Sequence, residues 1–537
     1  MTSKVKSIDS NDLDQEPSDD CALVLNQELT NFEDVLNKLG GFGKFQILSL
    51  VSILSLEIPA AFGIFVPIFL GVPPKSWTCV NDTFEWTLLA NESCSCPGEL
   101  TTTLDTSLVA EWTLVCDYAW VSDFITSFQM VGTLFGNLYA GSFADRYGRK
   151  YACLGATLLM FLGQVCSAIA PNFYVYGAAR FLAGIGFAGY ILISAIYSME
   201  FHTTEYRQVC GSVGPWGEGV MLLGLLAYLI RPWRHLCWAT TVPFLLILGF
   251  FFVPESPRWL LRNNKVAEAL RVTDTIARLN GKPPGTVQLA TLKYIAKNEI
   301  KMQESPGSEN GKVKTVSYLD MLRNRDLRFT TICLMTLWFS WSFTYFGISY
   351  NIRNMSGDPY LNVMFLGLTD VIGYPAGLLI CNRIGRRKSV AFFMTWATVF
   401  LVALALFELI VGLISYPQLL LAFCLVGKFG ASGARGCIRT LTGESYPTAC
   451  RAKGSGLGGV AAGVAGIVAP QLAFIGTYWP SIPFFVFALV SIMGAVVSFL
   501  LSETMGKPMK EMNTENKKDV PPELLKENNS NGLVTRL

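Results

Sequence analysis

Several charged residues stand inside long apolar runs of this 537-residue chain. A charge inside a membrane is costly, so such residues are functional candidates by default. Four of them are acidic and four are basic, and mutual pairing is therefore the structural alternative. They are Glu57, Asp123, Arg180, Glu218, Asp370, Lys428, Arg435 and Arg439. Their types predict the binding of a small charged molecule between helices.

Arg435 and Arg439 are four residues apart and so share one face of a helix. Two guanidinium groups on one face would favour carboxylates or sulfates, because arginine can hold a planar anion through two parallel hydrogen bonds. Arg439 lies near the predicted cytoplasmic end of its run, where pairing with Glu444 in a gate is the alternative. Lys428, in the same run, is a further candidate ligand.

Glu218 lies near the middle of an apolar run, two residues from Trp216. A carboxylate and an aromatic face together could hold a cation. A proton-coupling carboxylate or a partner for Arg435 would produce the same pattern. The remaining candidates for a substrate site are Asp370, Trp338 and Tyr345, although packing is the alternative for the two aromatic residues.

Catalysis has no support in the sequence, since only His202 and His235 occur and no metal-ligand or nucleophile-base arrangement is visible. The stretches 184–189 and 454–459 match a dinucleotide-binding pattern. Neither follows a strand, so close helix packing explains them better. We expect no enzyme, no cofactor, no metal and no nucleic-acid partner.

The chain is 51% hydrophobic and only 15% charged, which is outside the range of ordinary soluble domains. Runs of about 20 apolar residues can cross a bilayer as helices. The first six predicted spans are 46–70, 119–140, 151–170, 173–198, 210–230 and 235–253. The second six are 329–350, 361–380, 389–413, 418–442, 454–476 and 482–501. We therefore predict an all-α membrane protein with twelve transmembrane helices.

Lysine and arginine residues predict the orientation, because positively charged loops are retained on the cytoplasmic side. The polar, acidic first 44 residues do not resemble a cleavable signal peptide. With both termini cytoplasmic, the outer loops contain only four basic residues, which are Lys75, Arg231, Arg234 and Arg353. The predicted divisions are a cytoplasmic segment 1–44, a first half 45–253, a cytoplasmic linker 254–327, a second half 328–502 and a cytoplasmic tail 503–537.

Residues 71–118 then form an extracellular loop. Four cysteines in an oxidising compartment predict two disulfides, with the connectivity left open, among Cys79, Cys94, Cys96 and Cys116. Two glycosylation sequons lie in the same loop, at Asn81 and Asn91, and Asn354 begins a third.

Each half carries three landmarks in the same order, which indicates an internal repeat. GSFADRYGRK at 141–150 matches LICNRIGRRK at 379–388, 200–207 matches 444–451, and PESPRW from Pro254 matches SETMGKP from Ser502. Such repeats place a binding site near the bilayer midplane between two halves that rock against each other. The candidate gating residues are Gly141, Asp145, Arg146, Gly148, Arg149, Glu200, Arg207, Glu255, Arg258, Asn382, Arg383, Gly385, Arg386, Glu444 and Arg451.

We expect Arg146, Arg149 or Lys150 to pair with Glu200 or Glu255, and Asp145 to accept hydrogen bonds from backbone N–H groups at a neighbouring helix end. Asp145 is matched by the uncharged Asn382 in the second half. The first copy should therefore contribute more to gating. Retention of the loops on the cytoplasmic side is the alternative explanation for the basic residues.

GSFADRYGRK, PESPRWLL at 254–261 and GESYPTACR at 443–451 resemble the major facilitator superfamily. AEWTLVCDYAWVSDF at 110–124, AYLIRPWRHL at 227–236 and the cysteine-rich outer loop are similar to its organic cation, organic anion and carnitine transporter family. The resemblance covers about Phe32 to Pro508 and implies two six-helix halves, a central polyspecific cavity and no ATP hydrolysis.

In that family a residue of the eleventh span often follows the sign of the substrate charge, and an acidic residue is common in the eighth span. The corresponding positions here are Gly463 and Gly373, so the resemblance does not predict the sign. Asp370 lies one helical turn before Gly373 and could face the same way.

The last four residues, 534–537, fit a PDZ-domain ligand that would add a strand through its carboxylate. The sequence as a whole predicts a plasma-membrane transporter for organic cations, carnitine-like zwitterions or organic anions, working by alternating access in the lipid bilayer. A sugar-porter-like facilitator is one alternative. A transport-inactive receptor or trafficking protein is the other.

Overall fold

The computed structural model describes residues 31–505, except for 75, 82–83, 90–93, 97–98, 102–106, 213, 304–320, 322, 356, 412–415 and 447–449. Asn91, the side chain of Asn81 and the proposed PDZ ligand at 534–537 lie outside the described residues.

The first half contains six membrane-crossing segments, and the first, fifth and sixth are interrupted. In chain order its helices are α3 (Lys44–Leu54), α4 (Glu57–Phe65), α5 (Pro67–Leu70), α7 (Val121–Tyr147), α8 (Arg149–Ala168), α9 (Phe173–Glu200), α10 (Thr204–Ser212), α11 (Trp216–Leu229), α12 (Trp233–Ala239) and the 3-10 helix η3 (Val242–Phe251). Pro215 separates α10 from α11, since proline has no N–H to donate to the helix.

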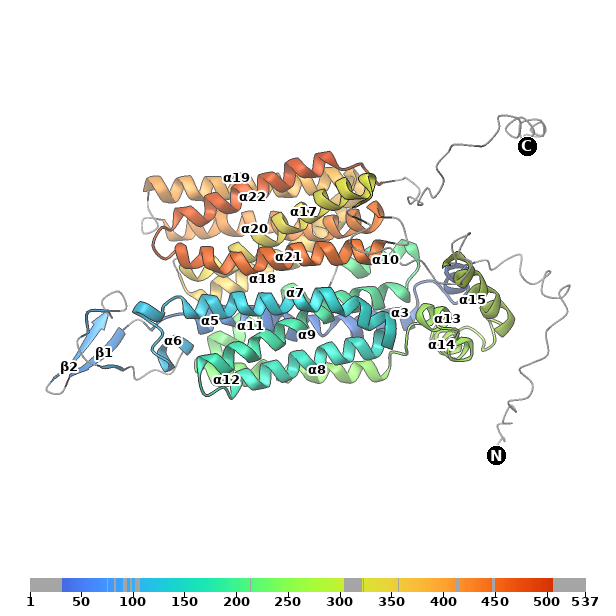
Figure 1. The fold of residues 1–537 in the computed structure, drawn as a ribbon, viewed down its shortest axis with the longest axis horizontal. Helices are drawn as coiled ribbons and strands as arrows, with labels where there is room; N and C mark the ends of the chain where they lie inside the picture. The colour runs from blue at the N-terminus through green and yellow to red at the C-terminus, as the bar shows by residue number, and fades with distance from the viewer. Residues whose placement is uncertain are drawn as a thin grey trace.

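The second half contains six longer and largely unbroken helices. They are α17 (Arg325–Asn351), α18 (Pro359–Ile384), α19 (Arg386–Val411), α20 (Pro417–Ser445), α21 (Arg451–Ile475) and α22 (Ser481–Leu500). Figure 1 shows this half as one layer and the first half as a second layer beside it.

All twelve predicted spans coincide with helical segments, but two differ from a simple apolar helix. Ten helices in the described chain are long and apolar enough to cross a membrane. α7 has 27 residues but carries polar side chains such as Gln129 and Asn137, which donate to the carbonyl groups of Gly63 (3.0 Å) and Gly459 (3.2 Å) on neighbouring helices. The predicted span 210–230 is wrong at its start, since the break before Trp216 leaves an apolar helix of 14 residues.

Glycines bring neighbouring helices into close contact. A β-carbon on Gly184 of α9 would lie 2.2 Å from the carbonyl oxygen of Gln129 on α7, and one on Gly132 would lie 2.2 Å from that of Phe181. The predicted packing role of Gly184 is therefore confirmed. The two halves meet in the same way where α11 crosses α18, because a β-carbon on Gly217 would lie 2.7 Å from the amide nitrogen of Val371.

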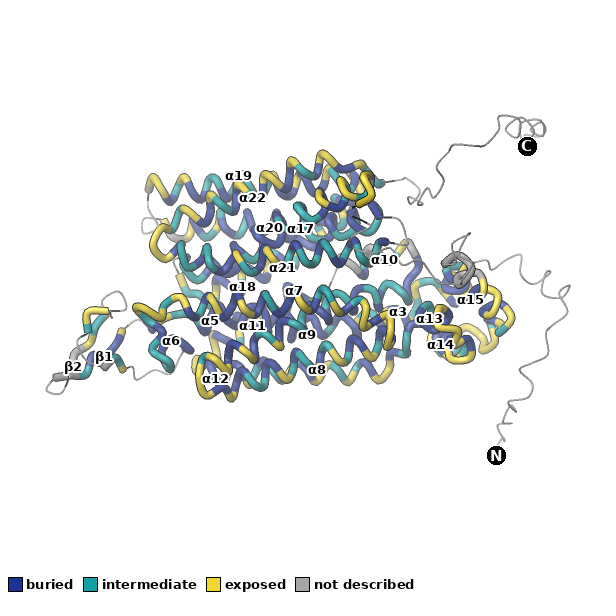
Figure 2. Tube along the Cα trace, in the orientation of Figure 1, coloured by how far each residue is buried: buried dark blue, intermediate teal, exposed yellow. Residues whose placement is uncertain are grey.

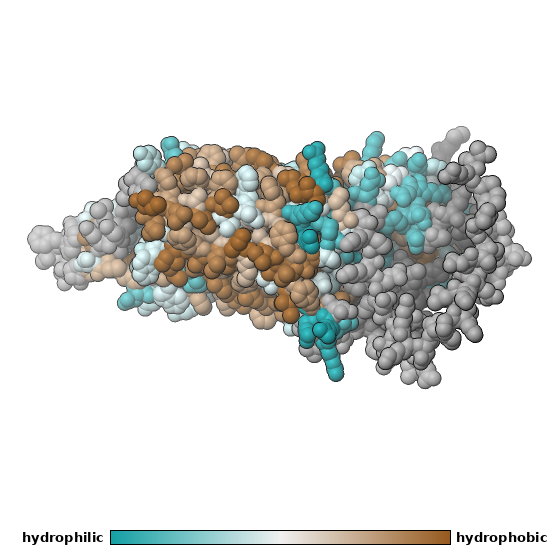
Figure 3. Space-filling model, turned by 90° about the horizontal axis from the view of Figure 1, so that it is seen from above, coloured by the Kyte–Doolittle hydropathy of each residue, from teal (hydrophilic) through white to brown (hydrophobic). Residues whose placement is uncertain are grey.

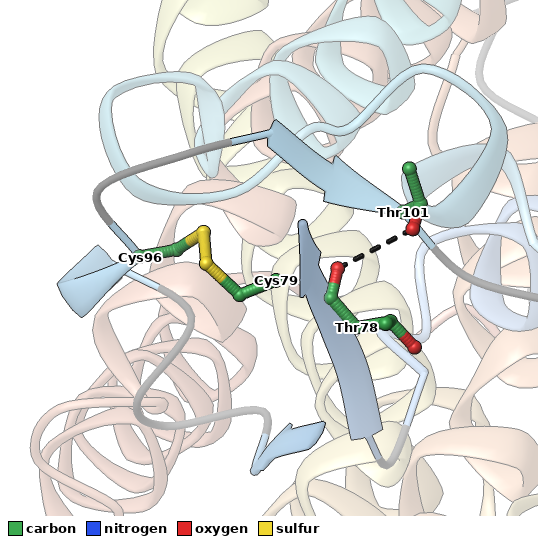
Figure 4. Close-up of a disulfide and its surroundings, with 4 residues drawn as sticks. All are labelled: Thr78, Cys79, Cys96 and Thr101. Carbon is green, nitrogen blue, oxygen red and sulfur yellow. Dashed lines mark hydrogen bonds between the residues drawn. A yellow bond between two sulfur atoms is a disulfide. The ribbon is translucent and has the colours of Figure 1, made fainter. Parts of the chain in front are cut away.

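Residues from the predicted outer loop form a small antiparallel sheet, which the sequence analysis did not predict. Its order is β2 (Phe84–Leu89), β1 (Ser76–Asn81), β3 (Glu99–Thr101), and α6 (Leu108–Glu111) follows it. Two disulfides join Cys79 to Cys96 and Cys94 to Cys116, which resolves the open connectivity. Figure 4 shows the first of them beside the hydrogen bond from the Thr101 hydroxyl to the Thr78 carbonyl (3.4 Å).

The described part of the polar segment between the halves includes three short helices at the end of the molecule opposite the sheet (Figure 1). They are α13 (Pro257–Arg262), α14 (Val266–Leu279) and α15 (Leu289–Gln303). Asn280 ties this group to the start of the first half, because its amide donates to the Leu39 carbonyl (2.9 Å) and accepts from the Phe45 N–H (3.0 Å).

The outer faces of the long helices are apolar. Figure 2 shows buried residues where helices face one another and exposed residues on the outside of the bundle. Figure 3 shows a continuous hydrophobic region between the sheet and the opposite, more hydrophilic end. Exposed residues such as Phe251 (80% exposed) and Ile410 (79%) belong to these outer faces, as expected for contact with lipid tails.

We predict that Gly184→Ala destabilises the protein by about 1–3 kcal/mol, because the added methyl group must push α9 away from α7. The midpoint of thermal aggregation in detergent should fall by several degrees. Gly155→Ala is the matched control, since a β-carbon there would meet nothing within 4 Å. Equal midpoints for the two variants would contradict the close crossing.

Candidate substrate site and gates

A chain of hydrogen bonds joins the two halves at the centre of the molecule. The indole nitrogen of Trp216, on α11, donates to the Tyr345 hydroxyl on α17 (2.8 Å). The Tyr345 hydroxyl in turn donates to Oδ2 of Asp370 on α18 (2.6 Å). Ser432 on α20 donates to the other carboxylate oxygen of Asp370. Four helices thus meet around one buried carboxylate.

Lys428 is fully buried beside this chain. Its ammonium group donates to the Ser349 hydroxyl (2.6 Å) and to the Tyr345 carbonyl (3.2 Å), and it lies 2.9 Å from the centre of the Tyr345 ring. These contacts satisfy the three N–H donors of the ammonium group. Lys428 and Asp370 are both 0% exposed in this arrangement, and their role as substrate ligands stays a prediction.

Arg435 lies at the junction of the two halves. Its guanidinium carbon is 4.9 Å from the centre of the Tyr374 ring and 5.8 Å from that of Trp216. Arg439 follows one turn later and interacts with Arg435, with Glu57 of α4 and with Cys210 of α10. Both arginines are half-buried, unlike Lys428. The structure thus brings together the predicted pair Arg435 and Arg439.

Glu218 and Trp216 lie on different faces of α11, so this arrangement does not bring the two side chains together, although Glu218 acts electrostatically on the buried Glu57. Trp216 is buried and faces the centre, whereas Glu218 is exposed on the same face of α11 as Leu222, Leu225 and Leu229. Residues two apart on a helix point in nearly opposite directions, which is the physical reason. Trp338 is also peripheral, since it donates to the Thr442 hydroxyl within the second half (3.0 Å).

Sequence reasoning missed several members of this centre. Glu57 was recognised only as an intramembrane charge, yet it is buried close to both arginines, and its Oε2 has no hydrogen-bond partner in the described residues. Tyr374, Ser349 and Ser432 carried no signal, because single uncharged polar residues are common in membrane helices. The Tyr-Pro-Ala stretch from Tyr374 is the one clue that could have found the tyrosine.

Arg180 is buried in the first half with neutral partners. Its guanidinium donates to the side-chain oxygens of Gln129 (2.8 Å) and Gln164 (2.8 Å) and to the Gly63 carbonyl. Gln164 is itself held by the Thr240 hydroxyl (2.6 Å). This positive charge is therefore satisfied by hydrogen bonds and not by the ion pair expected from the structural alternative.

An ion pair closes the two halves at the end that carries the sheet. Arg353, after α17, donates to Asp123 of α7 (2.7 Å), and both side chains are largely buried. Nearby, the rings of Phe69 and Tyr360 stack at 5.3 Å. Asp123 was predicted as an intramembrane charge, but its partner was missed because Arg353 lies in a predicted loop.

At the end of the bundle next to α13, the motif of the first half is held together by Arg149. Its guanidinium bonds Asp145 (2.8 Å) and Glu200 (3.1 Å), which confirms the predicted pairing with Glu200. Asp145 was predicted to accept hydrogen bonds from backbone N–H groups, but its carboxylate bonds the Arg149 side chain instead. Glu255 takes that role and accepts from the amides of Arg149 (2.9 Å) and Lys150 (3.2 Å) at the start of α8, where a negative charge suits the helix dipole.

The second half repeats this arrangement, except that among the described residues Arg386 bonds one acidic side chain where Arg149 bonds two. Arg386 bonds Glu444 (3.1 Å), and Glu503 accepts from the Arg386 amide (2.9 Å) at the start of α19. Glu444 thus bonds Arg386, while its suggested pairing with Arg439 stays a prediction. Asn382, the counterpart of Asp145, is exposed.

Two glycines explain how each carboxylate reaches its helix. Gly148 (φ +100°) and Gly385 (φ +98°) adopt a backbone conformation that other residues rarely take. A β-carbon on Gly148 would lie 2.3 Å from Glu255, and one on Gly385 would lie 2.7 Å from Glu503. Gly141 meets nothing within 4 Å and has no such role in this arrangement.

The two carboxylates differ in proton affinity. Burial raises the pKa of Glu255 above its usual value, against the opposing effect of three backbone N–H donors. Burial acts in the same direction on Glu503, but the N–H groups of Met505, Arg386 and Thr504 outweigh it and lower the pKa of Glu503.

The remaining motif residues lie around the N-terminal helix α2 (Phe32–Lys38) or in solvent. Glu33 bonds both Arg207 (2.8 Å) and Arg258 (3.3 Å), so α2 bridges α10 and α13. Arg451 acts electrostatically on Arg207 from the second half. Arg146 lies over the Tyr147 ring (5.4 Å), and Arg383 is exposed.

Asn354 is unfavourably placed for glycosylation. Its amide nitrogen donates to the Asn351 side chain (2.8 Å) and to the Ala473 carbonyl (2.7 Å), and the residue is half-buried. A glycan on this nitrogen would have to break both bonds.

Comparison with known proteins identifies the family. The model of the family described as "Sugar (and other) transporter" matches residues 101–515. An organic cation transporter protein of Drosophila melanogaster is 31% identical over 80% of this chain and 78% of its own length. Solute carrier family 22 member 6-B of Xenopus laevis is 28% identical over 89% of this chain and 93% of its own.

Solved structures show the same fold. The xylose transporter XylE of E. coli in an inward-open conformation aligns with a TM-score of 0.60, at 18% identity, over 86% of this chain and 98% of that one. XylE in complex with 6-bromo-6-deoxy-D-glucose, described as a proton:xylose symporter, also gives a TM-score of 0.60, at 16% identity. The chain therefore belongs to the sugar (and other) transporter family of the major facilitator superfamily, and its curated relatives are organic cation transporter and solute carrier family 22 proteins.

Proposed function

We propose that this transporter carries small organic anions across the plasma membrane by alternating access. The observation that supports this most directly is the placement of Arg435, half-buried between the rings of Trp216 and Tyr374 at the junction of the halves. A guanidinium framed by aromatic rings suits an aromatic carboxylate or sulfonate, which offers both a charge and an apolar surface.

The other charged residues at the centre also favour an anionic substrate. Asp370 is fully buried and already bonded to Tyr345 and Ser432, so it is not available to a cationic substrate. Glu57 is the one central carboxylate near the arginines with an oxygen lacking a partner in the described residues. Because of Glu57, a zwitterionic substrate is the second candidate. The Glu57 carboxylate could accept a hydrogen bond from the ammonium group of such a substrate while Arg435 binds its carboxylate.

The name of the Drosophila relative refers to organic cations, but the centre of this chain does not resemble a binding site for cations. Arg435 and Arg439 are both half-buried there, and their guanidinium groups would repel a cation. Relatives at this level of identity can differ in substrate while sharing the fold.

The alternating-access part of the proposal rests on the contacts between the halves. At the sheet end they include the buried ion pair of Asp123 with Arg353, whereas the cytoplasmic ion pairs of Arg149 and Arg386 each join residues of the same half. A substrate could therefore leave toward the cytoplasm without breaking an inner ion pair of those motifs. We place both termini in the cytoplasm, and we propose a PDZ-domain partner for residues 534–537.

Uptake into cells tests the substrate class. Cells expressing the chain should accumulate a labelled aromatic carboxylate in a saturable way, more than a quaternary amine or a carnitine-like zwitterion. Saturable uptake of the amine alone would contradict the anion proposal. No saturable uptake of any class, with the protein at the surface, would contradict transport.

We predict that Arg435→Ala lowers kcat/KM for the anion about 10- to 100-fold, since a charged hydrogen bond is worth about 1.5–3 kcal/mol. Arg435→Lys should retain part of the activity because it keeps the charge but not the planar fork. Arg278→Ala, at an exposed position on α14, is the control and should behave like the unmodified chain. An equal loss for all three substrate classes would show a structural role for Arg435.

We also predict that Asp123→Asn opens the sheet end of the protein. Labelling of Cys introduced at the buried Ser127 by a membrane-impermeant thiol reagent should become about tenfold faster, because a shift of about 1.4 kcal/mol suffices for that change. The double exchange Asp123→Arg with Arg353→Asp should restore slow labelling. Fast labelling that the double exchange does not slow would argue against this ion pair as a gate.

A further inference from the structure

We propose that Arg231, together with the rings of Tyr228 and Tyr360, forms an outer subsite that binds aromatic carboxylates or sulfonates at the sheet end of the protein. This inference rests on the anion transport proposed above. It adds a binding position that the substrate occupies before it reaches Arg435.

Arg231 lies at an exposed position directly after α11. Its guanidinium carbon is 4.2 Å from the centre of the Tyr360 ring and 5.0 Å from that of the Tyr228 ring. Tyr228 is exposed and Tyr360 is half-buried. A guanidinium beside aromatic rings offers two parallel hydrogen bonds to a planar acid group and an apolar surface to the ring that carries this group.

The charge of Arg231 is not neutralised within the described part of the chain, where this side chain forms no ion pair. Arg234, three residues later, bonds Glu111 of α6 and so fixes this loop at the sheet end. Asp358 precedes Tyr360 by two residues, but its carboxylate accepts from the Tyr360 N–H (2.9 Å) and caps α18. The guanidinium of Arg231 is therefore free to bind an anion from solution.

The central site has the same composition as this outer subsite. Arg435 faces the Tyr374 ring of α18 (4.9 Å) and the Trp216 ring of α11 (5.8 Å). Arg231 faces one ring from each of the same two helices. A ligand that fits one of these arrangements should therefore also fit the other.

The two arrangements lie at different levels of one pair of packed helices. A β-carbon on Gly217 would lie 2.7 Å from the amide nitrogen of Val371, and one on Gly224 would lie 3.0 Å from that of Met364, so α11 and α18 run in opposite directions. Between the levels of Trp216 and Tyr228 the helix rises by about 18 Å, at about 1.5 Å per residue. An anion with one aromatic ring is much shorter than this distance, so it occupies the two positions one after the other.

The outer subsite is built from both halves. Arg231 and Tyr228 belong to the first half, whereas Tyr360 belongs to the second and also stacks on Phe69 of the first (5.3 Å). When the halves part at the sheet end, Tyr360 moves away from Phe69 and Arg231. An anion captured by Arg231 then reaches Arg435 from this end of the bundle.

Initial rates of p-toluenesulfonate uptake into cells expressing the chain test the subsite. We expect Arg231→Ala to raise KM about five- to tenfold and to change the maximal rate by less than about twofold, because electrostatic capture limits uptake only when the substrate is dilute. Arg231→Lys should recover about half of the lost kcat/KM, since it keeps the charge without the planar fork. Arg271→Ala, at an exposed position on α14 at the opposite end, is the matched control and should keep the original KM.

Two further comparisons separate a subsite from a general effect of charge. The gap in kcat/KM between the unmodified chain and Arg231→Ala should shrink as ionic strength rises, because salt screens the capture of an anion by an exposed charge. Tyr228→Leu should raise KM for p-toluenesulfonate but not for methanesulfonate, which carries the same charge without a ring. An unchanged KM in Arg231→Ala, or an equal rise for p-toluenesulfonate and a quaternary amine, would overturn the subsite while leaving anion transport intact.

Binding to purified protein gives a readout that does not depend on transport. In lipid nanodiscs, saturation-transfer NMR should detect p-toluenesulfonate on the Arg435→Ala variant, because the outer subsite remains. The signal should disappear in the double variant that also carries Arg231→Ala. Equal signals from the two variants would overturn the subsite, whereas a signal that depends on Arg231 in a chain without saturable uptake would count against the proposed function alone.

Discussion

A charge held away from water inside a membrane must be satisfied by fixed partners, and much of this structure depends on how that requirement is met. Arg180 is satisfied by two glutamines and a carbonyl, Asp370 by two hydroxyl groups, and Lys428 by a hydroxyl, a carbonyl and a ring. The arrangements around Arg180 and Asp370 each need three or more helices at fixed separations, and that of Lys428 needs α17 and α20. The close crossings at Gly184 and Gly217 provide such separations.

The same requirement gives the two halves a common design at the end opposite the sheet. In each half a carboxylate from beyond the sixth segment accepts the free N–H groups at the start of the third. A glycine in a left-handed conformation makes room for it, and an arginine of the same turn reaches the glutamate at the end of the fourth segment. The halves differ in that Arg149 bonds two acidic side chains and Arg386 bonds one. The expectation that the first copy contributes more to gating stays a prediction.

The centre differs from these repeated motifs because one of its bonds joins the two halves. Trp216 belongs to the first half and Tyr345 to the second, so any change in their relative position acts on the hydrogen bonds of Asp370. The ion pair of Asp123 with Arg353 has the same property at the sheet end. Groups that join the halves are those through which a substrate and a conformational change can influence each other.

The sequence by itself determined the membrane class, the twelve segments, the repeat and the charged candidates, since hydropathy, charge and spacing are local properties that a helix preserves. Arg435 with Arg439 and Arg149 with Glu200 followed from such patterns. Only the tertiary structure decided that Glu218 points away from Trp216 and that Asp370 is fully buried. It also decided that Glu255 and not Asp145 caps α8, and that Arg353 forms an ion pair with Asp123. These outcomes depend on how helices are rotated and which residues far apart in the chain become neighbours, and packing of the whole bundle sets both.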